Sequence, residues 1–191
     1  MLHRVVRCSF YSISKTFFMT LAFSTAINGS LSFFVEKILN SLVNEELIKV
    51  SDYRNYCKEY DERHLITNYT LGNKNHTIRK DEHNRWRPGM LIHFAIGNRT
   101  KKRYQFAPVV KCVSTQTIQI KWIGTFINIG IDEKPYLTFN TAASWSMGLK
   151  NDYSKICELS KNDGFDNLQG FLNYFNTDFT GKLIHWTNLK Y

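Results

Sequence analysis

Five short segments in the middle of the chain are rich in β-branched and aromatic residues, and they constrain the fold more than any other feature of the sequence. Residues 117–122 (Thr-Ile-Gln-Ile-Lys-Trp) alternate between polar and apolar side chains, as a half-buried strand does. The turn-formers Gly97-Asn98 and Gly130 lie near segment ends. This spacing predicts a small twisted sheet or barrel. The five segments span residues 90–96, 104–114, 116–123, 126–131 and 136–139.

Helices are predicted both before and after these segments in the sequence. Residues 33–47 carry apolar side chains on one helical face, after Ser32 as a suitable N-cap, and Ser51 can begin a second helix. Residues 152–160 predict a third helix, and Asp166 can cap a fourth that continues to Phe175. Strands at 19–25 and 181–186 complete an α+β domain around a closed or nearly closed sheet. The core face of the first helix is predicted to hold Phe34, Ile38, Leu39 and Leu42.

The chain of 191 residues is long enough for one domain, which we assign to residues 19–191 with a helical insertion at about 33–62. Residues 1–18 contain three cations and no acid, and allow three interpretations. A signal peptide would use residues 17–23 as its apolar region and 24–26 as its cleavage site. A membrane helix would be interrupted by Asn28-Gly29-Ser30, short of the roughly 18 apolar residues that it needs. We favour the third interpretation, a weakly ordered extension before a start at Met19.

The four cysteines (Cys8, Cys57, Cys112 and Cys157) are far apart and show no CxxC spacing. They therefore predict neither a disulfide framework nor a zinc site. His76, His83 and His93 likewise have no metal-like partners in register. We expect a cytoplasmic protein with no metal, no cofactor and no membrane contact.

The net charge of +9 is concentrated in one part of the chain. Residues 72–103 contain nine Lys and Arg against two acids, a local charge of +7. Such a field attracts polyanions, nucleic acid first, although charges also keep a solvated hairpin soluble. The cations within it are Lys74, Arg79, Lys80, Arg85, Arg87, Arg99, Lys101, Lys102 and Arg103.

The segment 72–79 holds the most chemically suggestive group of side chains. In a straight strand Thr77 and Arg79 share one face and His76 shares the other with Ile78, while Lys74 belongs to the preceding turn. A Lys beside a hydroxyl and an Arg can bind phosphate. Alternatively, a Lys with a lowered pKa can act as a base that activates the Thr hydroxyl, provided that an acid lies nearby. A solvated strand end without a ligand remains the third interpretation.

Two further basic groups are candidates for nucleic-acid contact. Arg85-Trp86-Arg87 can stack a base between two cations, or Trp86 can be a core residue with its neighbours in water. Residues 99–103 (Arg-Thr-Lys-Lys-Arg) predict a hairpin tip suited to a phosphate backbone. His185-Trp186 near the end of the chain is more consistent with a core position than with a ligand site.

Several of these motifs resemble the ASCH domain, a family of PUA-like fold with members in phages and prophages. The resemblance rests on Gly72-x-Lys74-x-x-x-x-Arg79 and on residues 88–94, which are similar to the strand after the family's motif. It continues in residues 159–175 and 181–186, which look like the ending of such proteins, and it covers about residues 19–191. The resemblance implies a small PUA-like β-barrel of ASCH type with flanking helices.

The resemblance also implies a function in binding RNA or a modified nucleoside, in a basic cleft around the motif. The ligand-binding residues would be Lys74, His76, Thr77, Arg79, Arg85, Trp86, Arg87, Arg99, Lys101, Lys102 and Arg103.

One branch of the family carries Lys-x-x-Thr-x-Arg and removes an acyl group from a cytidine amine. Likeness to it would make Lys74 the base, Thr77 the nucleophile and Asp163 the acid, although the branch has a glutamate in that place. RNA or nucleoside binding is our first expectation, deacylation the alternative, and an acidic protein partner the third.

Overall fold

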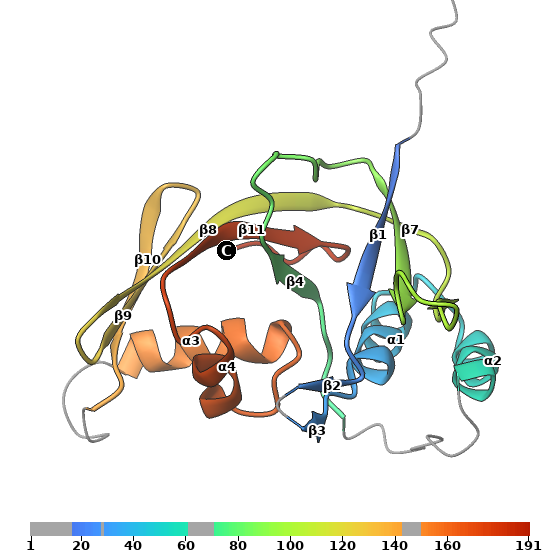
Figure 1. The fold of residues 1–191 in the computed structure, drawn as a ribbon, viewed down its shortest axis with the longest axis horizontal. Helices are drawn as coiled ribbons and strands as arrows, with labels where there is room; N and C mark the ends of the chain where they lie inside the picture. Colours follow the sequence, from blue (N-terminus) through green and yellow to red (C-terminus); the bar gives the residue numbers. More distant parts are fainter. Residues whose placement is uncertain (1–16, 28, 61–70, 143–149) are drawn as a thin grey trace, which may run out of the picture.

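The computed structural model describes residues 17–27, 29–60, 71–142 and 150–191 as a mixed α+β fold (Figure 1). The described helices are α1 (Phe34–Asn44), α2 (Val50–Tyr60), α3 (Lys150–Asn162) and α4 (Leu168–Tyr174). The first strands are β1 (Phe18–Phe23), β2 (Ala26–Ile27), β3 (Ser30–Leu31), β4 (His76–Arg79) and β5 (Leu91–Ile96). They are followed by β6 (Tyr104–Gln105), β7 (Val110–Lys111), β8 (Ser114–Ile123), β9 (Phe126–Ile131), β10 (Lys134–Asn140) and β11 (Phe179–His185). The predicted α+β class is confirmed.

Two sheets carry most of the fold. The larger sheet is antiparallel and five-stranded, in the order β10-β9-β8-β11-β4. In the smaller, four-stranded sheet β5 pairs in parallel with β1 and antiparallel with β6 and β7. β2 and β3 form a separate hairpin. The final strand of the chain, β11, therefore lies inside the larger sheet, between β8 and β4, the strand of the 72–79 motif.

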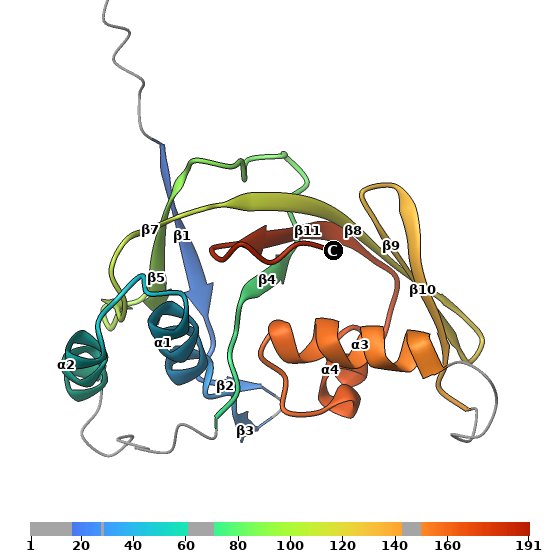
Figure 2. The same cartoon turned by 180° about the vertical axis from the view of Figure 1, so that it is seen from behind.

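The two sheets are joined along one side and separate along the other. The chain passes almost directly from β7 into β8, and both views show this long curved segment spanning the molecule (Figures 1 and 2). On the opposite side, β1 and β4 are the edges of their sheets, and no backbone pairing joins them within the described residues. The predicted closed barrel is thus not formed by strand pairing in this part of the chain.

Each sheet packs on its own hydrophobic cluster. The first cluster lies between α1 and the smaller sheet and includes the predicted helix face Phe34, Ile38, Leu39 and Leu42, which is confirmed as core. The second lies between the larger sheet and α3 and α4, which cover one face of that sheet (Figure 1). β8 alternates buried and exposed residues along most of its length, as the sequence predicted.

The helix starts differ from prediction at two caps. The N-cap of α1 is Phe33, in the left-handed region at φ 51°. The predicted cap Ser32 lies one residue earlier, where its hydroxyl donates to the Ser24 carbonyl at 2.6 Å and accepts from the Phe34 amide at 3.4 Å. The N-cap of α4 is Asn167, whose side chain accepts from the Gly170 amide at 2.8 Å. Asp166 does not cap, because its carboxylate pairs with Lys37 at 2.6 Å.

The predicted strand at 104–114 is divided into two short strands. β6 and β7 are separated by a segment containing Pro108, which has no amide hydrogen to donate to a ladder. The Gln105 side chain donates instead to the Ala107 carbonyl at 3.1 Å.

The first strand is a core element of the smaller sheet, with Leu21 and Phe23 buried. Of the proposed extension 1–18, residues 1–16 lie outside the described part, as do residues 61 and 62 of the predicted helical insertion. In the described ranges no helix combines the length and apolarity needed to cross a membrane.

Candidate ligand-binding site

β4 places the motif between two parts of the fold. One edge of the strand pairs with β11, opposing His76 to His185 and Arg79 to Lys182. At its other edge the Ile78 amide donates to the Asp163 carboxylate at 3.1 Å. Asp163 directly follows α3, so the end of this helix is hydrogen-bonded to the free edge of the motif strand.

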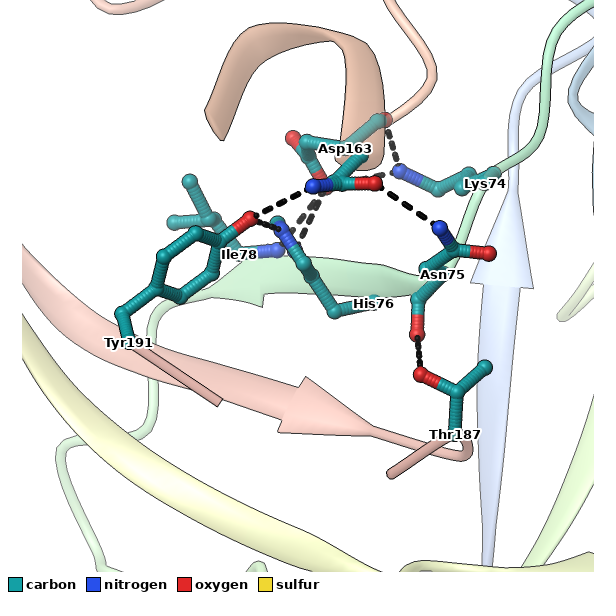
Figure 3. A network of polar contacts seen from close by, with 8 residues as sticks. Lys74, Asn75, His76, Ile78, Asp163, Thr187 and Tyr191 are labelled. Carbon is teal, nitrogen blue, oxygen red and sulfur yellow. Dashed lines mark hydrogen bonds and ion pairs between the residues drawn. The ribbon is translucent and has the colours of Figure 1, made fainter. Parts of the chain in front are cut away.

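Lys74 and Asp163 form a buried ion pair beside this edge (Figure 3). Lys74 is 1% exposed, and its Nζ donates to Asp163 Oδ1 at 2.7 Å and also to the Asp163 carbonyl. The ammonium lies over the rings of Phe34 and Phe23, 4.5 and 5.8 Å from their centroids. Rings of this kind favour a cation through their negative faces. The lysine is therefore held by a carboxylate, a carbonyl and two aromatic faces.

Burial shifts the titration of both partners. It lowers the pKa of Lys74 to about 8, against the attraction of Asp163, which acts in the opposite direction. Burial raises the pKa of Asp163, opposed by Lys74, by Arg79 and by the Ile78 amide. An amine with a pKa of about 8 is partly neutral near physiological pH, as a general base must be.

A second buried lysine fixes the same turn. Lys37 of α1 donates from Nζ to the Gly164 carbonyl at 2.8 Å and to Asp166 at 2.6 Å, and its own carbonyl accepts from the Lys74 amide. Gly164 has φ +88°, and a Cβ at this position would lie 3.0–3.2 Å from the Lys74 side chain. The turn between α3 and α4 therefore requires glycine and is held by two lysines.

Thr77 and Arg79 share one face of β4 by strand alternation, and Arg79 extends to β1. The Arg79 guanidinium donates to the Ala22 carbonyl at 2.8 Å and lies 4.9 Å from the centroid of the Phe23 ring. It thus bridges the unpaired edges of the two sheets. Thr77 is 2% exposed, and no hydrogen bond between described residues joins its hydroxyl to Lys74 or Asp163.

His76 belongs to a buried cluster at the other end of the strand. Its Nε2 is 2.9 Å from the Tyr191 hydroxyl, which also accepts from Asn162 at 3.1 Å (Figure 3). The His76 and His185 rings are 5.2 Å apart, and three of their four nitrogens have no hydrogen-bond partner in the described structure, although His76 Nδ1 lies 3.8 Å from Asp163 Oδ1. Burial lowers the pKa of His76 well below its usual value and that of His185 to about 4, so both rings are neutral at pH 7.

The sequence did not indicate that Tyr191, Asn162 and His185 would join the motif. One signal was present, because a final strand paired with the motif strand would oppose His185 to His76. The pairing partner itself could not be read from the pattern.

The second candidate group is divided between core and surface. Trp86 is 5% exposed within the first hydrophobic cluster, so its ring is a core residue and not the stacking surface expected of it. The amides of Arg85 and Trp86 donate to Asp81, whose carboxylate also lies 3.5 Å from Lys182 Nζ. These bonds hold the loop so that the Arg85 and Arg87 side chains are exposed beside a buried indole.

The predicted hairpin tip is confirmed, since residues 97–103 connect the antiparallel strands β5 and β6. Gly97 turns the chain at φ +58°, where a Cβ would lie 2.7 Å from the Lys102 carbonyl. All four cations of the tip are exposed: Arg99, Lys101, Lys102 and Arg103. Together with Arg85 and Arg87 they make two cation clusters, one before β5 and one after it.

Neither cluster contains an acid. The sequence from His83 to Ile131 has no Asp or Glu and eight Lys or Arg. Within the described residues, no three His, Cys, Asp or Glu side chains are grouped as metal ligands would be.

A groove of about 570 Å³ lies on the larger sheet, with Gln119, Asn128 and Thr138 in its lining, and it does not include Lys74 or Asp163.

Comparisons with models of protein families, with curated proteins and with solved structures find no match to this chain.

Proposed function

We propose that this protein is an RNA-binding module of PUA-like, ASCH-type architecture. The observation that carries the proposal is the set of six exposed cations before and after β5, in a stretch of 49 residues (83–131) without an acid. Exposed Lys and Arg that are not neutralised by neighbours bind phosphates and release counterions. The six are Arg85, Arg87, Arg99, Lys101, Lys102 and Arg103.

The arrangement of strands supports the PUA-like part of the proposal. On one side of the molecule β7 and β8 are almost continuous and join the two sheets. On the other side β1 and β4 are unpaired edges within the described residues, and we call the gap between them the β1–β4 seam; pairing across it would close the two sheets into a ring. The motif strand lies at this seam, and Arg79 bridges it. In this architecture Lys74 and Asp163 support the seam, and the phosphate contacts belong to the exposed cations.

A salt titration with labelled single-stranded RNA tests the proposal. We expect binding at low salt whose affinity falls linearly on a log–log plot, by roughly one unit of slope for each phosphate contact. Lys101→Gln with Lys102→Gln should lower the affinity and reduce that slope by about 2. Lys155→Gln on α3 is the matched control, away from both clusters. Absence of RNA binding at low salt would refute the function, and protein capture that survives nuclease treatment would point to an acidic protein partner instead.

One observation favours amide hydrolysis as a second candidate function. A buried lysine with a pKa of about 8, paired with a carboxylate at 2.7 Å and followed three residues later by Thr77, has the composition of a base–nucleophile–acid set. Among the described residues the Thr77 hydroxyl has no hydrogen bond to Lys74, so this reaction requires a shift that brings the two side chains together. Thr77 would then attack the acyl carbon and pass its proton to neutral Lys74, which would donate it to the leaving amine. The amide C–N bond would break, the protonated amine would leave, and water would hydrolyse the resulting ester.

Incubation with N4-acetylcytidine distinguishes this candidate. The activity should appear as pH rises through about 8, because neutral Lys74 is required and its pKa is about 8. Thr77→Val preserves the shape of the side chain and should abolish turnover, whereas Thr77→Ser should retain part of it. Equal rates for the native protein and Thr77→Val would exclude Thr77 as a nucleophile.

A further inference from the structure

The outer face of the smaller sheet carries an exposed aromatic residue that no core contact explains. β1 alternates so that Leu21 and Phe23 are buried, while Phe18 on the opposite side is 68% exposed. Exposing a phenyl ring of this size forfeits about 2 kcal/mol of burial. A ring in this position therefore costs stability unless something covers it.

Phe18 is positioned by a second ring. His93 of β5, which pairs in register with Thr20, contacts Phe18 diagonally, with ring centroids 5.4 Å apart and an interplanar angle of 56°. The His93 Nδ1 is 2.9 Å from the Gln105 side chain of β6. Three adjacent strands thus place two ring systems and an amide side by side on one surface.

Cations border this surface at both ends. Arg103 reaches across the face, with Nη2 3.5 Å from the Thr20 hydroxyl, and belongs to the cluster after β5. Lys111 of β7 pairs in register with Leu91 at the other end of β5, on the side of Arg85 and Arg87. The six residues of β5 separate the two ends by about 20 Å. No acidic residue occurs in β1, β5, β6 or β7.

We infer that this outer face, centred on Phe18 and His93, is a platform on which unpaired bases of single-stranded RNA stack, with the flanking cations on its phosphates. The inference rests on the proposed RNA-binding function and on a chain that includes Phe18, the first residue of β1, and it adds the location of base contact. Aromatic rings on a sheet between cations are what a single strand needs, because every base has a face to stack and every linkage has a charge. An acidic protein would match the cations, but it would leave the paired rings without an aromatic partner.

Binding of labelled oligouridylate of about eight nucleotides, a length within the usual range of such sites, tests the platform. Phe18→Leu keeps an apolar side chain without a π face and should weaken binding about tenfold, while Phe18→Tyr should bind like the native protein. The salt slope should be unchanged in Phe18→Leu and reduced by about 1 in Arg103→Gln. Phe126→Leu, at an exposed phenylalanine of the larger sheet, is the matched control and should have no effect.

The outcomes separate the two proposals. If the native protein binds no RNA at low salt, the proposed function fails. If it binds with a steep salt slope but Phe18→Leu and Phe126→Leu have equal affinities, RNA binding stands and the platform is refuted. Equal affinity for an RNA duplex of the same length would also refute the platform, because paired bases cannot stack on protein rings.

Discussion

Lys74 Nζ lies 2.7 Å from Oδ1 of Asp163, although 89 residues separate the two in sequence. Each is less than 5% exposed, so water screens neither charge. The pair joins the segment before β4 to the turn after α3, and the Asp163 carboxylate also accepts from the Ile78 amide. Asn75 adds two bonds between the same segments, from its amide to the Asn162 carbonyl and from its side chain to the Asn162 side chain, both at 2.8 Å.

Asp163→Asn should destabilise the protein by about 3 kcal/mol or more, because it leaves a buried cation without its counterion while keeping an acceptor for the Ile78 amide. Urea unfolding at pH 7 measures the loss. The loss should shrink as pH rises toward about 8 and stay level above it. Without Asp163 the pKa of folded Lys74 is lower than in the native protein, so just below about pH 8 the folded variant has released a proton that the folded native protein keeps, and rising pH stabilises the variant alone. Above about pH 8 Lys74 is neutral in both folded proteins, and both respond alike.

The matched control is Asp166→Asn, which removes the partner of the other buried lysine. Asp166 is 64% exposed, and Lys37 keeps the Gly164 carbonyl as a partner, so the loss of stability should be below about 1 kcal/mol.

A double variant tests the coupling between Lys74 and Asp163. Adding Lys74→Met to Asp163→Asn should restore part of the stability that Asp163→Asn loses. If the loss of unfolding free energy in the double variant equals the sum of the losses in the two single variants, the two residues are not energetically coupled.

Gly164→Ala should be more costly than the same change at another left-handed glycine. At Gly124 (φ +59°) no atom lies within 4 Å of an added Cβ, so only the backbone strain of about 1 kcal/mol applies. At Gly164 (φ +88°) the Cβ would also press on the Lys74 side chain at 3.0–3.2 Å. Thermal unfolding compares the stability of the two variants. Equal losses of stability would show that the Lys74 side chain moves away from the added Cβ without a measurable energetic cost.

Acid should destabilise the protein through His185. Its pKa is about 4 in the folded state and 6.5 in the unfolded chain, so between these values the unfolded state binds more protons and stability falls as pH falls. The full difference corresponds to about 3 kcal/mol. His185→Phe should reduce the dependence of unfolding free energy on pH in this window without abolishing it, because burial also lowers the pKa of His76. His83→Ala, at an exposed site, should leave the dependence unchanged.

The sequence predicted the elements better than their assembly. Alternation and helical periodicity are local signals, and they located β8, β9 and the buried face of α1 to within a few residues. The cap at Asn167 was missed because Lys37 pairs with the Asp166 side chain that would otherwise have capped. The cap of α1 was placed one residue early, and Ser32 still accepts from the Phe34 amide.

The candidate site shows the same limit. Lys74 and Asp163 could be associated only through a family resemblance, because nothing local in the sequence links residues on different elements. Trp86 was ambiguous for the opposite reason: flanking arginines look the same whether the indole between them is buried or exposed. Phe18 was not considered as a ligand contact, because its exposure follows from the parallel register of β1 with β5.

Arg79→Met should open the seam between the sheets without unfolding the protein. The guanidinium gives β4 a charge-assisted bond to the Ala22 carbonyl and a cation–π contact with Phe23, together about 2 kcal/mol. β1 is paired on its other side only with β5, whereas β8 and β11 are paired on both sides. Removing the bridge therefore weakens the edges and leaves the centre of the larger sheet intact.

Native-state hydrogen exchange resolves this difference. In Arg79→Met the amides of β1 and β4 should exchange at least roughly tenfold faster than in the native protein. The exchange rates of the β8 and β11 amides should rise only by the amount that the change in global unfolding free energy accounts for. Arg79→Lys should behave like Arg79→Met, because an ammonium cannot reproduce the planar fork. Arg87→Met, at an exposed arginine, is the control. Uniform acceleration across both sheets would contradict a local seam, because it would mean that β1 and β4 separate only when the whole fold unfolds.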